Sequence, residues 1–158
     1  MRNPDFAQSS DGSVTGWETD SSDPNITLDS VSAPDGKGTI AQFKSAAAGR
    51  ELLVNQAVTL CPGKRYQFSV STQQAKKLAS CRVTCTMVYA DGTRSQILSV
   101  EPEEAWTPSS ASFTAGSQAE ADLEVAAKCE GFQGIPVSAQ EDEGWMRVEV
   151  QKVSLVRE

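Results

Sequence analysis

Short runs in which apolar and polar residues alternate recur along most of this chain. Such alternation has the period of a β-strand, because successive side chains of a strand point to opposite faces. The runs are spaced regularly and separated by turn residues, which is typical of an antiparallel sandwich. We therefore expect an all-β fold, a two-sheet antiparallel β-sandwich, with its first and last strands near each other. The expected strands are 26–32, 38–45, 52–60, 65–73, 81–90, 94–100, 109–115, 121–129 and 145–156.

Three of these strands separate an apolar face from a polar one. The side chains expected in the core are Tyr66, Phe68, Val70, Cys81, Val83, Cys85, Met87, Tyr89, Met146, Val148 and Val150. Their opposite faces carry Arg65, Gln67, Arg82, Arg147, Glu149 and Gln151. A strand of this kind packs one face on the core and leaves the other in water. If the sheet curves, the polar face becomes a groove lined by hydrogen-bonding side chains.

Two turns have specific sequence signals. Pro62-Gly63 predicts a turn in which Pro presets φ and Gly supplies a positive φ. Asp91-Gly92 favours a two-residue type I′ hairpin between strands 81–90 and 94–100.

Composition narrows the possible functions. The 158 residues predict a single domain over 1–158 and carry a net charge of −7. Because the chain has no basic stripe, we expect no nucleic-acid partner. Its negative net charge also argues against binding to an anionic membrane surface. The chain has no histidine, which removes the usual general base, the Ser-His-Asp and Cys-His nucleophiles and the commonest metal ligand. Catalysis is therefore not expected, although carboxylate, Lys or Tyr chemistry stays open.

Four cysteines, Cys61, Cys81, Cys85 and Cys129, predict disulfides and hence a secreted protein. Cys81 and Cys85 share a strand, which sets their Cα atoms roughly 13 Å apart, whereas a disulfide needs less than about 7 Å. Two pairings remain, and we favour Cys81–Cys129 with Cys61–Cys85. A zinc site is disfavoured by the spacing and by the absence of histidine.

Trp145 is the leading candidate for a ligand contact. It begins the polar face of the last expected strand, beside Arg147 and Glu149. An aromatic ring next to planar polar groups is suited to stacking on a sugar and hydrogen-bonding its hydroxyls. A tryptophan that only caps the sandwich edge is the alternative. Further candidate site residues, if their strands adjoin, are Gln42, Arg65, Gln67 and Arg82.

Acidic residues suggest no catalytic or metal site. The runs at 101–104 and 141–143 stand in turn contexts, where carboxylates are normally solvated, so a glycosidase pair is not expected. Asp20, Asp23 and Asp29 match no calcium-loop spacing. We predict no cofactor and no metal.

Several short signatures, taken in order, resemble carbohydrate-binding modules of the family 4 and 9 type, within the galactose-binding-like jelly rolls and closest to secreted fungal versions. They are Asn3-Pro4-Asp5-Phe6, Gly16-Trp17, 58–69 with Leu60-Cys61-Pro62-Gly63, Trp106 to Gly116, and 148–156. The resemblance implies a jelly roll that binds glycans on a concave face or at loop tips, usually attached to an enzyme. The family often holds a structural calcium with an Asp-Asp pair where this chain has Gln151 and Lys152, so calcium is not expected here.

The leading hypothesis is a secreted, non-catalytic module that binds a soluble polysaccharide or oligosaccharide through Trp145, Arg147, Glu149, Gln67 and Arg82. One alternative is a protein-interaction domain, which predicts an exposed apolar patch. Another is a small-molecule enzyme of the cyclase or pericyclase kind, which predicts an enclosed pocket between the sheets.

Overall fold

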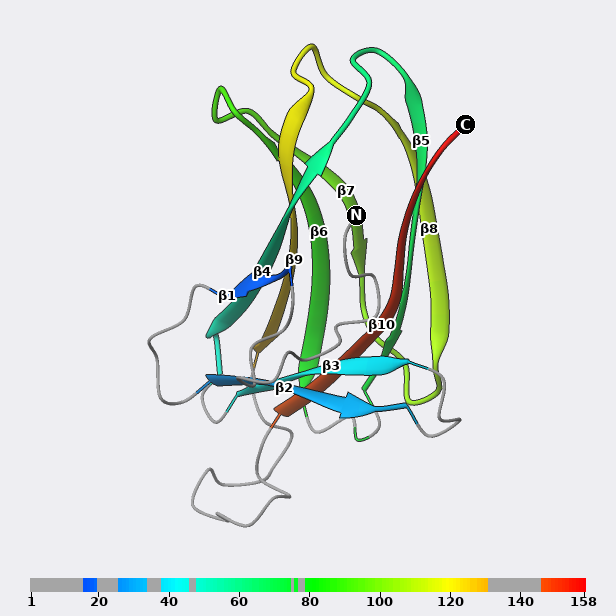
Figure 1. The fold of residues 1–158 in the computed structure, drawn as a ribbon. Helices are drawn as coiled ribbons and strands as arrows, with labels where there is room; N and C mark the ends of the chain where they lie inside the picture. Colours follow the sequence, from blue (N-terminus) through cyan, green and yellow to red (C-terminus); the bar gives the residue numbers. More distant parts are fainter. Residues whose placement is uncertain are drawn as a thin grey trace.

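Two five-stranded antiparallel sheets packed face to face make up the fold (Figure 1). The computed structural model describes residues 16–19, 26–33, 38–45, 48–74, 76, 79–130 and 146–158. The first sheet, here sheet I, has the order β1 (Glu18–Thr19), β4 (Glu51–Thr59), β9 (Glu120–Glu130), β6 (Ser80–Tyr89), β7 (Arg94–Val100). The second, sheet II, has the order β2 (Ile26–Ser32), β3 (Thr39–Ser45), β10 (Met146–Arg157), β5 (Arg65–Gln73), β8 (Thr107–Thr114). The predicted antiparallel β-sandwich is confirmed.

All nine strands expected from the alternation are present, with their ends shifted by at most two residues. The additional strand, β1, has only two residues and shows no alternation of its own. The first expected strand, β2, and the last, β10, belong to the same sheet, but β3 lies between them.

The core lies between the sheets and is formed by the inward faces of both. The side chains assigned to the core from strands 65–73, 81–90 and 145–156 are buried, which confirms the face assignments. Phe68, Met87 and Leu123 are among the largest of the fully buried side chains. Trp17 is buried with them, whereas Trp106 is half-buried.

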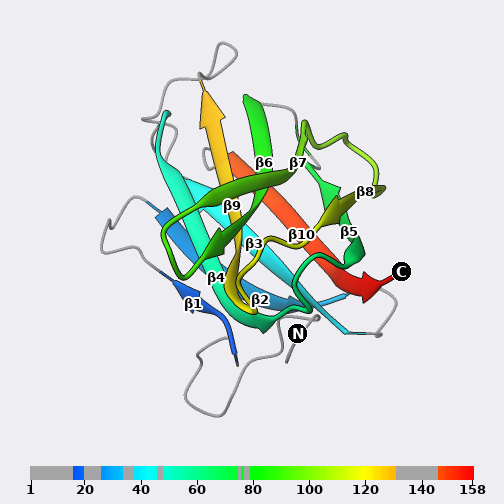
Figure 2. The same ribbon diagram turned by 90° about the horizontal axis from the view of Figure 1, so that it is seen from above.

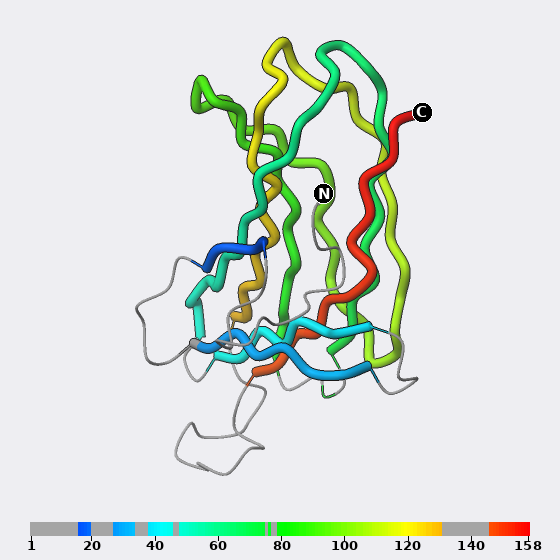
Figure 3. The backbone as a smooth tube through the Cα atoms, in the orientation of Figure 1, coloured from blue at the N-terminus to red at the C-terminus, as the bar shows by residue number. Residues whose placement is uncertain are grey.

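Sheet II is bent along β10. In Figures 1 and 3, β2 and β3 run across the molecule while β5 and β8 stand upright. The first half of β10 pairs with β3 through Met146–Val150, and the second half pairs with β5. Between Gln151 and Ser154 the strand has one more residue than its β5 partner, and Lys152 there has a φ of 54°. This bulge lets one strand serve two differently oriented parts of the sheet.

The predicted turn at Pro62-Gly63 is confirmed. Gly63 has a φ of 67°, and the Lys64 amide donates to the Cys61 carbonyl at 3.1 Å.

The hairpin between β6 and β7 differs from the prediction. A type I′ turn needs positive φ at both central residues, and here Gly92 (φ 82°) has it while Asp91 does not. The Gly92 amide donates to the Tyr89 carbonyl at 2.8 Å, and the Tyr89 amide donates to the Thr93 carbonyl at 2.9 Å. These bonds define a three-residue loop with a glycine bulge. The Thr93 amide also donates to the Asp91 carboxylate at 2.9 Å, which lowers the pKa of that group.

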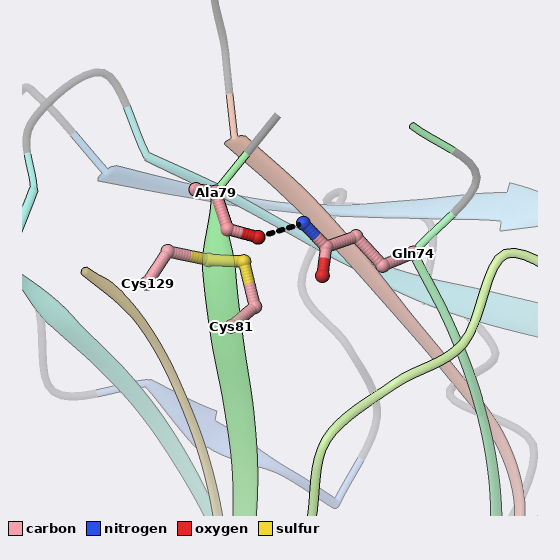
Figure 4. Close-up of a disulfide and its surroundings, with 4 residues drawn as sticks. All are labelled: Gln74, Ala79, Cys81 and Cys129. Carbon is pink, nitrogen blue, oxygen red and sulfur yellow. Dashed lines mark hydrogen bonds between the residues drawn. A yellow bond between two sulfur atoms is a disulfide. The ribbon is translucent and has the colours of Figure 1, made fainter. Parts of the chain in front are cut away.

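One of the two expected disulfides is present. Cys81 and Cys129 lie directly opposite each other on β6 and β9 and are bonded (Figure 4). The Cys61–Cys85 pairing is wrong, because Cys85 points into the core while Cys61 is exposed at the turn after β4. Figure 2 looks along the sandwich and shows β6 and β9 side by side, as their pairing requires.

Candidate functional site

Most of the polar residues predicted for the site lie on the outer face of sheet II. Gln42 of β3 and Glu149 of β10 are partners in the pairing of these strands. The Gln42 side-chain amide donates to the Glu149 carboxylate at 2.7 Å. Arg147 lies two residues from Glu149 on the same face, and Gln67 projects from β5 farther along the sheet. The structure therefore brings this part of the predicted set onto one surface.

The remaining predicted residues do not complete that surface. Arg82 is on β6 and projects from the outer face of sheet I, on the opposite side of the sandwich, where it pairs with Glu101 at 2.7 Å. Its expected grouping with Glu149 and Gln67 is wrong, because β6 does not belong to their sheet. Arg65 lies at the far end of β5 and pairs with Glu158 at 2.7 Å. Trp145 lies outside the described residues.

The outer face of sheet I carries a row of polar side chains that crosses the whole sheet. Pairing partners run from one strand to the next without a break, and all project away from the core. The members of this row, here the polar row, are Glu18 of β1, Asn55 of β4, Glu124 of β9, Thr86 of β6 and Gln96 of β7. With adjacent strands about 4.8 Å apart, the row is about 19 Å long. That length and direction suit an extended polymer lying across the strands.

A row of short or apolar side chains lies beside the polar row. Leu53, Ala126, Thr84 and Ser99 are partners across β4, β9, β6 and β7. Ala126 is only 8% exposed although it projects from an outer face. This row presents methyl and methylene groups next to the amides and hydroxyls of the polar row, a combination that fits the alternating C–H and O–H surfaces of a sugar ring.

Longer charged side chains flank these two rows. On one side Arg94 of β7 forms a bidentate ion pair with Glu124, in which the Nη1–Oε1 distance is 3.3 Å. The Glu124 side chain is 14% exposed, so this ion pair holds a nearly covered carboxylate within the outer face. On the other side lies Lys128, whose pKa is raised by its hydrogen bond to Glu130 and by the nearby charge of Glu51.

Sequence reasoning missed Asn55, Glu124, Thr86 and Gln96. The alternation within strands 52–60 and 121–129 already places Asn55 and Glu124 opposite the apolar residues. The missing information is the pairing order, which alone shows that these residues share one row.

The described residues show no other developed site. They contain no cluster of three or more His, Cys, Asp or Glu side chains that could hold a metal. Of the acids weighed for calcium, Asp29 pairs with Lys44 at 2.6 Å, and Asp20 and Asp23 lie outside the described residues. A hollow between the sheets, lined by Phe43, Arg50 and Met146 among others, has room for about one water molecule.

Two further observations bear on partners. Within the described ranges, Val156 at 59% exposure is the large apolar side chain that stands out in solvent, so no broad apolar patch is visible there. No helix that is long and apolar enough to cross a membrane occurs among the same residues.

Comparison with known proteins agrees with the fold. The family model described as a carbohydrate binding domain, of the 4 and 9 type, matches residues 1–151. Among curated proteins, no sequence matches this chain.

Solved structures with the same fold are distant in sequence. TmCBM61, determined in complex with beta-1,4-galactotriose, aligns over 100% of this chain and 97% of its own at 14% identity and a TM-score of 0.64. The CBM22-1 xylan-binding domain of Paenibacillus barcinonensis Xyn10C aligns over 92% of this chain and 88% of its own at 9% identity and a TM-score of 0.60. The CBM22-1–GH10 modules of Clostridium thermocellum xylanase 10B, complexed with xylohexaose, align over 90% of this chain and 26% of their own at 12% identity and a TM-score of 0.61.

Proposed function

We propose a binding surface and a class of ligand for this chain, which belongs to the carbohydrate binding domain family of the 4 and 9 type. It is a secreted, non-catalytic module that holds a soluble polysaccharide or oligosaccharide across the strands of sheet I, over the polar row. The observation that carries this assignment is the unbroken course of that row over all five strands.

The chemistry of sheet I supports the assignment. Asn55 and Gln96 present amide groups that make no hydrogen bond to another described side chain, and the hydroxyl of Thr86 lies between them in the row. An amide both donates and accepts, as a sugar hydroxyl does, so each amide can exchange two hydrogen bonds with a diol. The side chains needed for binding are thus present without prior rearrangement.

The outer face of sheet II, which carries Gln42, Gln67, Arg147 and Glu149 of the predicted set, is the second candidate surface. Its Gln42 and Glu149 satisfy each other, and Lys44 pairs with Asp29. The outward partners Asp29, Gln42, Glu149 and Gln73 also form a row, but it crosses four strands only, because the described pairing of β5 with β8 ends at Thr72. Gln67, Arg147 and Trp145 are the ligand contacts predicted for this competing site, and variants of them form the second arm of the test.

Aromatic side chains are absent from the outer face of sheet I within the described residues. A flat crystalline polysaccharide is usually held by several stacked rings, whereas a single soluble chain can be held mainly by hydrogen bonds. This supports a soluble ligand. The similar structures include a complex with galactotriose, a xylan-binding domain and a complex with xylohexaose, so β-1,4-galactan and arabinoxylan are suitable first probes.

Secretion and an enzyme partner are part of the same proposal. The Cys81–Cys129 disulfide supports an oxidising compartment. One similar structure carries its binding module together with a GH10 module, which supports a role beside a glycoside hydrolase.

The test is affinity electrophoresis in gels containing β-1,4-galactan, arabinoxylan, barley β-glucan or hydroxyethylcellulose. We expect at least one polymer to retard the wild type, and Asn55→Ala with Gln96→Ala to abolish the retardation. Gln67→Ala, on the opposite face, is the matched control and should bind as the wild type does.

Retardation lost with Gln67→Ala but kept by the Asn55 and Gln96 variant would move the site to sheet II. Retardation lost with Trp145→Ala would support the tryptophan contact predicted from the sequence. No retardation by any polymer would contradict carbohydrate binding at these surfaces. Circular dichroism of each variant separates lost binding from lost folding.

A further inference from the structure

The cations on the outer face of sheet I are all neutralised within the described part of the chain. Each side chain of this kind is held by a carboxylate of the same sheet or of the adjoining turn. The pairs are Arg94 with Glu124, Lys128 with Glu130 at 2.7 Å and Arg82 with Glu101 at 2.7 Å. A ligand lying on this face therefore meets no unpaired positive charge from the described residues.

Further carboxylates on the same face have no such partner. Glu18, Glu120 and Asp122 are exposed on the outer face of sheet I and make no ion pair among the described residues. Glu18 ends the polar row, and Asp122 stands two residues from Glu124 along β9, which places it about 7 Å from the row. Among the residues that the structure describes, the unpaired charge around the proposed site is thus entirely negative.

From this arrangement we infer that the module discriminates by charge: it accepts neutral polysaccharides and rejects chains that carry carboxylates or sulfates. The inference rests on the function proposed above, because it concerns the same surface. A uronate unit over the polar row lies near Glu18 and Asp122, and no cation of the face is available to compensate. A neutral chain of the same backbone carries no charge that Glu18 and Asp122 can repel.

The expected discrimination follows from Coulomb's law. Two like charges about 8 Å apart in water lower an affinity by about twofold. A polymer with several carboxylates over the face therefore binds about tenfold more weakly than its neutral counterpart at low salt. Because these charges are exposed, salt at about 0.5 M screens them and should remove most of the difference.

The experiment uses matched polymer pairs that differ in charge. They are hydroxyethylcellulose with carboxymethylcellulose, arabinoxylan with glucuronoxylan, and β-1,4-galactan before and after oxidation of its C6 hydroxyls to carboxylates. Dissociation constants are measured for the wild type at low salt and at about 0.5 M salt, where the Debye length falls to roughly 4 Å. We expect the neutral member of a pair to bind at both salts and the charged member to gain affinity as salt rises.

Variants assign the effect to this face. Glu18→Gln with Asp122→Asn removes the two unpaired charges nearest the polar row, and should bring the charged polymer within about threefold of the neutral one at low salt. Asp29→Asn with Glu149→Gln removes the same number of charges from the opposite face and should leave the gap unchanged.

The outcomes separate the two proposals. If the two members of a pair bind equally at low salt, or if the gap persists at high salt, charge discrimination is wrong and carbohydrate binding stands. If no neutral polymer binds, the proposed function itself fails, and the inference fails with it.

Discussion

Gln42 and Glu149, which lie 107 positions apart in the sequence, are joined by a hydrogen bond of 2.7 Å on the outer face of sheet II. Both were expected to contact a ligand, and in the structure each satisfies the other. The bond links β3 to β10 at a point where the two strands are paired. Its first role is therefore to hold the sheet together.

Removal of this bond should affect stability rather than binding. We expect Gln42→Ala to lower the free energy of unfolding by about 1–2 kcal/mol, because a partly buried hydrogen bond to a charged group is lost. Urea denaturation measures the change, and affinity electrophoresis should show unaltered retardation. A loss of binding without a loss of stability would instead return Gln42 to the ligand site.

The disulfide should contribute strongly to stability. Cys81 and Cys129 are 48 residues apart, and closing a loop of that length restricts the unfolded chain by about 4 kcal/mol in the chain-entropy model. We expect Cys81→Ala with Cys129→Ala to lose about 2–4 kcal/mol in guanidinium denaturation. Cys61→Ser is the control, since its exposed thiol forms no disulfide in the fold. An equal effect of both variants would contradict the assigned pairing.

Cys85 should weaken the fold in alkali. Burial raises the pKa of this thiol from 9.0 to about 12, so between these values it ionises only in the unfolded chain. The unfolded state then binds fewer protons than the native state, and stability falls as pH rises, by up to about 1.4 kcal/mol per pH unit. In a Cys61→Ser background, which leaves Cys85 as the one thiol outside the disulfide, Cys85→Ala should show a shallower decline between about pH 9 and about pH 11, within that window. Parallel curves would contradict the burial of this thiol.

Cys61 should be the reactive thiol of the native protein. Its sulfur accepts a hydrogen bond from Arg157 at 3.5 Å, and this bond, helped by Tyr66, lowers the pKa of the thiol. Iodoacetamide should therefore modify Cys61 at neutral pH while Cys85 reacts only after unfolding, as mass spectrometry of the labelled peptides can show. Arg157→Gln should shift the pH profile of labelling upward. An unchanged profile would mean that Arg157 has no part in it.

Gln74 should be important for the end of the sandwich that carries the disulfide. It is 2% exposed, and its side-chain amide donates to the Ala79 carbonyl at 2.9 Å (Figure 4). Gln74→Leu leaves that carbonyl without its partner, which should cost about 1–3 kcal/mol in urea denaturation. Gln73→Ala, which removes an exposed bond to the Glu104 carbonyl, should cost about 0.5 kcal/mol or less.

The fold was predictable because each strand has one buried face, which the alternation of its residues records. β1 escaped this reasoning because two residues cannot alternate. The bulge in β10 did leave a signal: buried positions run through Val148 and Val150 and resume at Val153, one residue out of phase. In the β6–β7 hairpin, Asp-Gly predicted the turn, but its type depended on whether Ala90 joined the loop.

The site was less predictable, because alternation shows which side chains face water but not which strands are neighbours. Arg82 and Glu149 stand in equivalent patterns, and only the sheet order places them on opposite sides of the sandwich. The same limit explains the wrong Cys61–Cys85 pairing. The opposed positions of Cys81 and Cys129 follow from the register of β6 and β9, whereas Cys61 lies beyond the end of its strand.

The extra residue in β10 has a consequence for how this protein can change. It shifts by one residue which positions of the strand face the core, so the alternation before Gln151 and the alternation after Ser154 are out of phase. A substitution in one half of β10 need not be accompanied by one in the other half, so the sequences of the two halves can change independently. Sheet I has no comparable joint along β9, its central strand, where pairing is continuous with both neighbours. A substitution on β9 therefore has to fit the pairing with β4 and with β6 at once.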